Sequence, residues 1–185
     1  MNKKEVVIEK ARELFTEYGY KKVSMDEIAK EANVTKKTIY TYFKDKDSMF
    51  QYFILEELEK MKAPLEEKKK KSSSFLSFVS ESLYYVLTYR KNSKLISTII
   101  KEVSQDKEAK SGAFLKLYDT EIINYIENSI KEEIESGNIK ECDSRLTAFI
   151  IYKVYIAVMF EYDQELDEEK VTKEITSILK DGLFN

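Results

Sequence analysis

The sequence predicts an all-α protein, with a small N-terminal domain joined to a larger one, and three observations support this. Apolar residues recur at intervals of three and four along almost the whole chain, which is the periodicity of an amphipathic helix. The 185 residues include one proline and four glycines, so few positions interrupt a helix. Runs that alternate polar and apolar residues, as strands do, are nearly absent.

The first predicted helix covers residues 3–18 and ends at Gly19, because glycine is common just past a helix end. Its apolar stripe consists of Val7, Ile8, Ala11, Leu14, Phe15 and Tyr18. A second helix should begin after Ser24, whose side chain can cap it while Glu27 reaches back to complete a capping box.

The next segment has the pattern of a helix-turn-helix. Asn33 follows the second helix, and asparagine tolerates the left-handed backbone that such a turn often needs. Thr35 can cap a third helix, which has lysines, threonines and tyrosines on one side and Ile39 and Phe43 on the other. Such a helix suits a phosphate-lined groove, so DNA is the first partner to consider.

The rest of the chain continues the helical pattern. A fourth helix should start near residues 45–48 and end before Pro64. Residues 68–74, four lysines and three serines, are interpreted as a solvated helix end and linker, with a second DNA contact as the alternative. Further helices are expected over 74–91, 93–105, 113–136, 143–162 and 168–183.

The composition excludes several kinds of active site. The chain has no histidine, four glycines and one cysteine, Cys142. These residues cannot supply the usual zinc site, a Cys–His or Ser–His nucleophile pair, or a glycine-rich phosphate loop. We therefore expect no metal, no cofactor and no enzyme. Acid–base chemistry by paired carboxylates is the enzymatic alternative, but no spacing singles out a pair.

Charge and hydropathy favour a DNA-binding protein of the cytoplasm. Residues 1–50 contain eleven Lys and Arg and nine Asp and Glu, a net charge of +2, and the other residues bring the total to -3. This asymmetry has the sign expected for a DNA-binding domain on an acidic body. No apolar run reaches the roughly 18–20 residues of a membrane span, and the first residues lack the apolar core of a signal peptide.

Several N-terminal motifs occur together between about Ile8 and Phe50. They are Ala11-x-x-Leu14-Phe15, Gly19-Tyr20, Ser24-Met25-Asp26-Glu27-Ile28-Ala29, Ala32-Asn33-Val34-Thr35 and Ile39-Tyr40-x-Tyr42-Phe43-x-x-Lys46. They resemble the TetR family of bacterial repressors, although Asn33 and Lys37 stand where that family often has glycine. The resemblance implies an all-helical homodimer with a helix-turn-helix DNA-binding domain over 1–47. Residues 48–185 would form a helical domain that dimerises and binds a small effector.

The resemblance also implies phosphate contacts by Ser24, Thr35, Tyr40 and Lys46. Hydroxyl groups can donate to phosphate, and Lys46 lies at a predicted helix N-terminus, which favours an anion. For Tyr40, packing against the first helix is an alternative that can hold at the same time. The exposed side of the third helix would read bases through Lys36, Lys37, Thr38 and Tyr42.

The C-terminal part is rich in aromatic residues that could line an apolar effector site with hydroxyls for orientation. They are Tyr84, Tyr85, Tyr89, Phe114, Tyr118, Tyr125, Tyr152 and Tyr155. Plain core packing is the alternative for each. The expected effector is small and apolar or aromatic, and for a cationic ligand Glu81, Glu102 or Glu121 could supply a counter-charge.

Two apolar stripes near the C-terminus predict a dimer interface. Two helices of this kind can pair with the same two of a second copy in a four-helix bundle, and packing within a monomer is the alternative. The expected interface residues are Leu146, Phe149, Ile150, Val154, Val171, Ile175, Ile178 and Leu179.

The expected function is that of a DNA-binding transcriptional regulator. Specifically, the resemblance to the TetR family implies a homodimeric repressor, bound to a palindromic double-stranded operator and released by a small-molecule effector. A helical module that binds another protein through its basic N-terminal helices is the main alternative, and the salt dependence of binding would separate the two.

Overall fold

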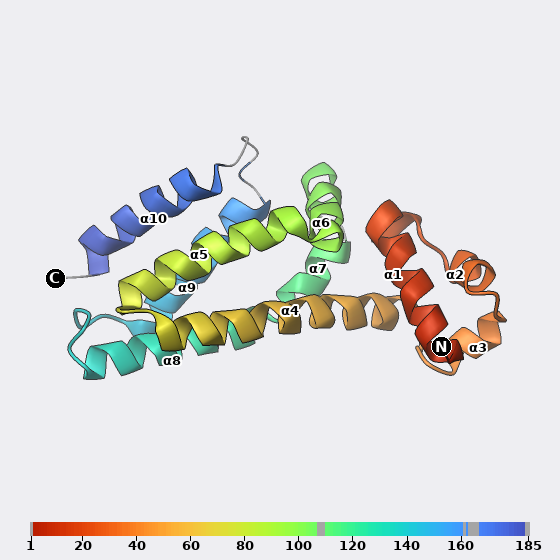
Figure 1. The fold of residues 1–185 in the computed structure, drawn as a ribbon, viewed down its shortest axis with the longest axis horizontal. Helices are drawn as coiled ribbons and strands as arrows, with labels where there is room; N and C mark the ends of the chain where they lie inside the picture. Colours follow the sequence, from red (N-terminus) through yellow and green to blue (C-terminus); the bar gives the residue numbers. More distant parts are fainter. Residues whose placement is uncertain (1, 107–109, 161, 163–166, 184–185) are drawn as a thin grey trace. The chain divides into compact units, whose positions relative to one another are not determined.

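The computed structural model describes residues 2–106, 110–160, 162 and 167–183. The regular structure of these residues is helical throughout, which confirms the all-α fold class (Figure 1). The helices are α1 (Lys3–Lys22), α2 (Met25–Glu31), α3 (Lys36–Tyr40), α4 (Lys46–Lys71), α5 (Phe75–Asn92), α6 (Lys94–Gln105), α7 (Lys110–Lys116), α8 (Asp119–Glu135), α9 (Ser144–Phe160) and α10 (Glu168–Leu183). Among the described helices, none is long and apolar enough to cross a membrane.

The chain divides into two compact units. Unit 1 contains Met1–Lys60 and Asn92–Lys116, and unit 2 contains Met61–Lys91 and Leu117–Asn185. Helices α6 and α7 therefore belong with α1, although about 70 residues separate them from it in the sequence. This grouping differs from a division at residue 47, which stays a prediction about function.

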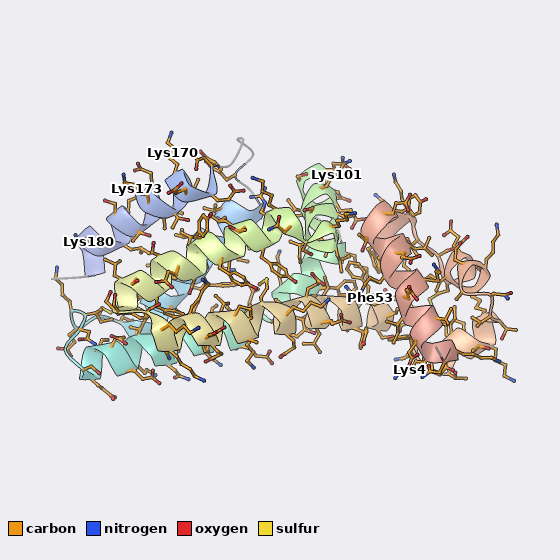
Figure 2. All side chains as sticks on the ribbon, in the orientation of Figure 1. Lys4, Phe53, Lys101, Lys170, Lys173 and Lys180 are labelled. Atoms are coloured by element: carbon orange, nitrogen blue, oxygen red, sulfur yellow. The ribbon has the colours of Figure 1, made fainter. Side chains whose placement is uncertain are left out.

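The core of unit 1 is aromatic. Phe15 on α1 is fully buried, and its ring centroid lies 5.0 Å from that of Phe50 and 5.9 Å from that of Phe53. Phe53, labelled in Figure 2, lies where α4 meets α1. Tyr20 at the end of α1 and Phe114 on α7 extend this cluster, with ring centroids 5.4 Å apart. Rings from α1, α4 and α7 thus share one core.

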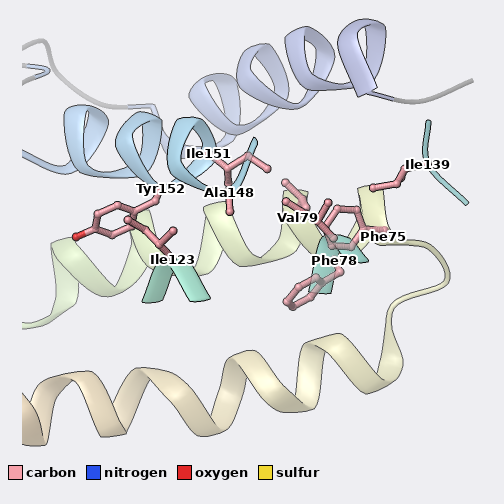
Figure 3. Close-up of a cluster of buried hydrophobic side chains, with 9 residues drawn as sticks. Phe75, Phe78, Val79, Ile123, Ile139, Ala148, Ile151 and Tyr152 are labelled. Atoms are coloured by element: carbon pink, nitrogen blue, oxygen red, sulfur yellow. The ribbon is translucent and has the colours of Figure 1, made fainter. Parts of the chain in front are cut away.

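The core of unit 2 joins α5, α8 and α9 (Figure 3). Its buried members are Phe75, Phe78, Val79, Ile123, Ile130, Ile139, Ala148, Ile151 and Tyr152. Leu179 of α10 packs against this cluster with partial burial. The apolar stripes of four helices are therefore combined into one core, as expected for a helical bundle.

The predicted end of the fourth helix is wrong. Instead of ending before Pro64, α4 continues to Lys71. A proline inside a helix removes one backbone hydrogen bond and costs about 3 kcal/mol. Side chains on both sides of the proline offset this cost, because Phe53 and Ile54 are fully buried in unit 1 and Lys69 donates to Ser129 at 3.0 Å in unit 2.

The helix predicted over 113–136 is also wrong, because the structure has two helices there. α7 ends at Lys116 and α8 begins at Asp119. Phe114 packs in the core of unit 1, whereas Ile123 packs in the core of unit 2. A continuous amphipathic stripe does not reveal that its two ends are buried in different units.

Candidate nucleic-acid interface

The start of α2 is fixed by the predicted capping box. The Ser24 hydroxyl oxygen accepts from the Glu27 N–H at 3.2 Å, and the Glu27 carboxylate accepts from the Ser24 N–H at 2.8 Å. The same carboxylate accepts from the Ser24 hydroxyl at 2.7 Å, and these bonds lower the pKa of Glu27. The first residue of this helix is therefore held at a defined place.

The turn between α2 and α3 has the geometry that its asparagine predicts. Asn33 has a φ of 50°, in the left-handed region. Its N–H donates to the Lys30 carbonyl at 3.1 Å, and the Val34 N–H donates to the Ala29 carbonyl at 3.0 Å. This pair of bonds is the Schellman arrangement at a helix end, and it turns the chain sharply into α3.

The third helix presents a polar side supported by a buried one. Ile39 is fully buried, and the ring of Phe43 lies 5.6 Å from that of Tyr52 on α4. The Thr35 hydroxyl oxygen caps α3 by accepting from the Thr38 N–H at 3.2 Å. Because Ile39 is buried, one side of α3 faces the protein and the residues opposite face outward.

The expected base-contacting residues lie on that polar side. Lys36 and Lys37 are exposed, and Thr38 and Tyr42 are half-buried. Tyr42 lies two residues after the end of α3, in a turn whose amides still bond to helix carbonyls. The Lys36 ammonium donates to the Asp26 carboxylate at 2.9 Å, so one lysine is oriented by α2.

The expected phosphate-contacting residues have different surroundings. Ser24 and Thr35 are exposed caps, and Tyr40 is 47% exposed. Lys46 is half-buried, and its ammonium donates to the Tyr20 and Val23 carbonyls, each at 2.9 Å. Burial lowers the pKa of Lys46. Its ammonium thus also holds the junction between α1 and α2.

Contacts between Tyr20, Asp47 and Lys110 were not expected from the sequence. The Tyr20 hydroxyl and the Lys110 ammonium both donate to the Asp47 carboxylate. Burial and the Asp47 bond raise the pKa of Tyr20 to about 12, and the two donors lower the pKa of Asp47. The three residues are far apart in the sequence, so their spacing carries no signal of this contact.

The residues expected to line an effector site do not all lie together. Phe114 belongs to the aromatic core of unit 1, whereas the seven tyrosines belong to unit 2. The Tyr152 hydroxyl donates to Asp119, and the Tyr155 hydroxyl donates to the Val79 carbonyl at 3.1 Å. Tyr84 is 47% exposed.

The other four tyrosines are half-buried: Tyr85 and Tyr89 on α5, Tyr118 just before α8, and Tyr125 on α8. The ring centroids of Tyr85 and Tyr89 lie 6.0 Å apart. The Lys68 ammonium lies 5.8 Å from the centroid of Tyr85, and the Lys69 ammonium lies 5.6 Å from that of Tyr125. The end of α4 therefore places cations beside aromatic rings.

The residues expected at a dimer interface leave an apolar stripe on unit 2. Leu146, Phe149 and Ile150 on α9 are 54%, 46% and 49% exposed, and Ile178 on α10 is 72% exposed. The other four, Val154, Val171, Ile175 and Leu179, are half-buried. Exposed apolar residues at helical spacing are typical of a surface that another molecule covers.

Comparison with known proteins identifies the family. The family described as "Bacterial regulatory proteins, tetR family" matches residues 7–53. The HTH-type transcriptional regulator YhgD of Bacillus subtilis (strain 168) is 35% identical over 174 residues, which cover 92% of this chain and 91% of that protein. The chain belongs to the TetR family. This TetR-family protein is thus a DNA-binding helix-turn-helix regulator of transcription, as its relatives are.

Two further proteins resemble this TetR-family regulator over most of its length. The fatty acid metabolism regulator protein of Bacillus subtilis (strain 168) is 27% identical over 188 residues, with 97% of this chain and 94% of that protein covered. The crystal structure of FadR from Bacillus subtilis in complex with stearoyl-CoA has the same fold, with a TM-score of 0.72 at 21% identity, covering 95% of this chain and 97% of that one.

Proposed function

We propose that this TetR-family regulator is a homodimeric repressor that leaves a palindromic operator when a small effector binds to unit 2. The observation that carries the proposal is the exposed apolar stripe on α9 and α10. Burying an apolar side chain contributes about 1.5–3 kcal/mol, so covering the stripe with a second copy would stabilise a dimer. A two-fold dimer presents two DNA-binding domains to two half-sites.

In this proposal the side chains around α3 make two kinds of DNA contact. Ser24, Thr35, Tyr40 and Lys46 contact phosphates, and Lys36, Lys37, Thr38 and Tyr42 contact bases. The Lys46 ammonium uses two of its three donors on carbonyls, which leaves one for a phosphate. Lys37 is exposed at the start of α3, so it suits contact with a base edge.

The assignment of phosphate and base contacts is tested with Lys46→Ala, Lys37→Ala and Tyr42→Ala. Lys46→Ala should weaken binding to operator and random DNA alike, because a phosphate contact carries no sequence information. Lys37→Ala and Tyr42→Ala should change which sequence is preferred in a selection from random duplexes. Equal losses on every sequence for all three variants would contradict this assignment.

We propose a fatty-acyl compound with an anionic end as the effector. A relative named as a fatty acid metabolism regulator supports an acyl ligand, and a neighbour of the same fold was solved with stearoyl-CoA. The half-buried rings of α5 and α8 suit an acyl chain. Lys68 and Lys69 lie beside two of those rings and suit a carboxylate or phosphate.

The effector is tested by titrating a long-chain acyl-CoA, the free fatty acid and its uncharged methyl ester. Binding of the acyl-CoA and of the free fatty acid, which are both anionic, should weaken in Lys68→Met and Lys69→Met but not in Lys70→Met, because Lys70 is exposed. Binding of the ester should be similar in all three variants. If Lys68→Met and Lys69→Met bind the acyl-CoA and the fatty acid as the original protein does, the anionic end of the effector does not lie at these lysines.

The whole proposal is tested by a footprint of the purified protein on the DNA flanking its own gene, with and without acyl-CoA. The expected result is a protected near-palindrome that loses protection when the effector is added. Protection of a single half-site would contradict the dimer, and protection that every acyl compound leaves intact would contradict the effector.

A further inference from the structure

The chain between Gly19 and Val23 joins α1 to α2 and is held by two other helices. Gly19 has a φ of 79° and a ψ of 174°, so the helical backbone is interrupted there. Ser24, which caps α2, follows Val23 directly. The direction of this junction therefore decides where α2 begins, and α3 packs against α2.

Helix α6 contacts the junction through Glu102. The Lys21 N–H donates to Glu102 Oε1 at 2.9 Å. The same side chain lies over Gly19, because a Cβ atom built there would be 2.4 Å from Oε1 and 2.8 Å from Cδ of Glu102. Glu102 thus satisfies a backbone donor at the point where the helix is interrupted, and it packs where only glycine leaves room.

Lys46 of α4 holds the same junction by donating to two of its backbone carbonyls. Its ammonium donates to the carbonyls of Tyr20 and Val23, and it lies 4.2 Å from the centroid of the Tyr20 ring. A carboxylate on an N–H and an ammonium on two carbonyls therefore hold one short segment. All three bonds involve a charged group, and such bonds are stronger than those between neutral groups.

Helix α6 is itself fixed within unit 1, so Glu102 is not a mobile surface side chain. Leu95, Ile96 and Ile99 are almost completely buried. The Thr98 hydroxyl donates to the Thr16 carbonyl on α1 at 2.6 Å. The Ser93 hydroxyl donates to Glu57 on α4 at 2.7 Å. Glu102 therefore extends from a helix anchored along its length.

We propose that Glu102 is a positioning residue for DNA binding, because its carboxylate fixes the Gly19–Val23 junction and thereby the direction in which α2 and α3 leave α1. Glu102 lies outside residues 7–53, which match the family, and it does not touch DNA in this proposal. The DNA-binding surface would thus need an acceptor from α6 to keep its geometry.

The test compares Glu102→Gln with Glu102→Ala. Both variants remove the same negative charge, but only glutamine keeps an oxygen that can accept from the Lys21 N–H. Affinity is measured by fluorescence anisotropy, on the operator and on a random duplex at low salt. We expect Glu102→Ala to lose about tenfold in affinity on both, and Glu102→Gln to stay within about threefold of the original protein.

Hydrogen exchange separates this local role from a general loss of stability. The Lys21 amide should exchange faster in Glu102→Ala than in Glu102→Gln, while the amides of α6 stay protected in both. Thr98→Val removes another bond between α6 and α1 and serves as the control, with DNA affinity expected to be unchanged.

The proposal is overturned if Glu102→Ala binds both duplexes normally, if Glu102→Gln loses as much affinity as Glu102→Ala, or if the Lys21 amide exchanges at the same rate in the two variants. None of these results depends on a palindromic operator or an effector.

Discussion

The conformation and packing of some single residues depend on residues that are distant in the sequence. Gly19 must adopt a left-handed φ and must also leave space for the Glu102 carboxylate. Gly137 has a similar φ of 71°, but nothing lies within 4 Å of where its Cβ would be. Gly19 therefore combines backbone strain with a close contact, whereas Gly137 has a positive φ without one.

We expect Gly19→Ala to destabilise the protein more than Gly137→Ala does. A left-handed φ costs alanine about 1–2 kcal/mol at Gly137. At Gly19 the φ of 79° with a ψ of 174° is a region open essentially to glycine alone, which costs alanine about 1–3 kcal/mol. At Gly19 the added Cβ would also displace Glu102 from the Lys21 N–H, and the loss of this hydrogen bond adds about 0.5–1.5 kcal/mol. Urea unfolding of the two variants measures the difference, and equal losses of unfolding free energy would contradict the close contact.

Tyr20 predicts a stability change at alkaline pH. Its pKa is raised to about 12 by burial and the bond to Asp47, whereas tyrosine in an unfolded chain titrates near 10. The raised pKa contributes stability that is complete below about pH 10 and is lost as the pH rises toward 12. The free energy of unfolding should therefore fall between pH 9 and 11 by less in Tyr20→Phe than in the original protein. The exposed Tyr84→Phe should fall as the original does, and a Tyr20→Phe curve parallel to the original would contradict the assignment.

Among the helices, some bury their apolar side within the chain, and others leave part of it exposed. In α6 the apolar side is buried, as the almost complete burial of Ile99 shows. In α9, Ala148 and Ile151 face the core of unit 2, while Phe149 and Ile150 are about half exposed. An apolar helix with two such sides has more apolar surface than one chain covers.

We expect Ile178→Glu to convert a dimer into monomers, because a charge placed in an apolar interface would have to be desolvated. Ser177→Glu adds the same charge at an exposed neighbouring position and serves as the control. Sedimentation at micromolar concentration measures the mass, and operator affinity should fall together with dimerisation, since two half-sites need two linked domains. An Ile178→Glu protein that stays dimeric would place the interface elsewhere.

At the scale of the whole molecule, an acidic chain binds an acidic partner. The net charge is -3, so attraction to DNA must come from the local set of lysines and hydroxyls around α3. Of the four proposed phosphate contacts per copy only Lys46 is a cation, so a dimer would neutralise roughly two phosphates, and the logarithm of affinity should fall with the logarithm of salt with a slope of about -2. Affinity that does not change with salt would favour a protein partner instead.

The sequence predicts the local geometry of the DNA-binding domain well, because that geometry depends on residues three or four apart. The capping box of Ser24 and Glu27 and the left-handed Asn33 are confirmed. The roles of the eight proposed DNA-contacting residues stay predictions. The end of α4 and the break between α7 and α8 could not be read from periodicity, because packing in two different units decides them.

Caps, turns and apolar stripes are properties of short segments, so the all-α fold, the helix-turn-helix and the place in the TetR family could be predicted from the residues alone. Only the tertiary structure brought Glu102 and Lys46 to the same junction and placed Lys110 on Asp47. Those contacts join residues 23 to 81 positions apart. The packing of the helices determines which of these residues meet, and the order of charged residues along the sequence does not reveal it.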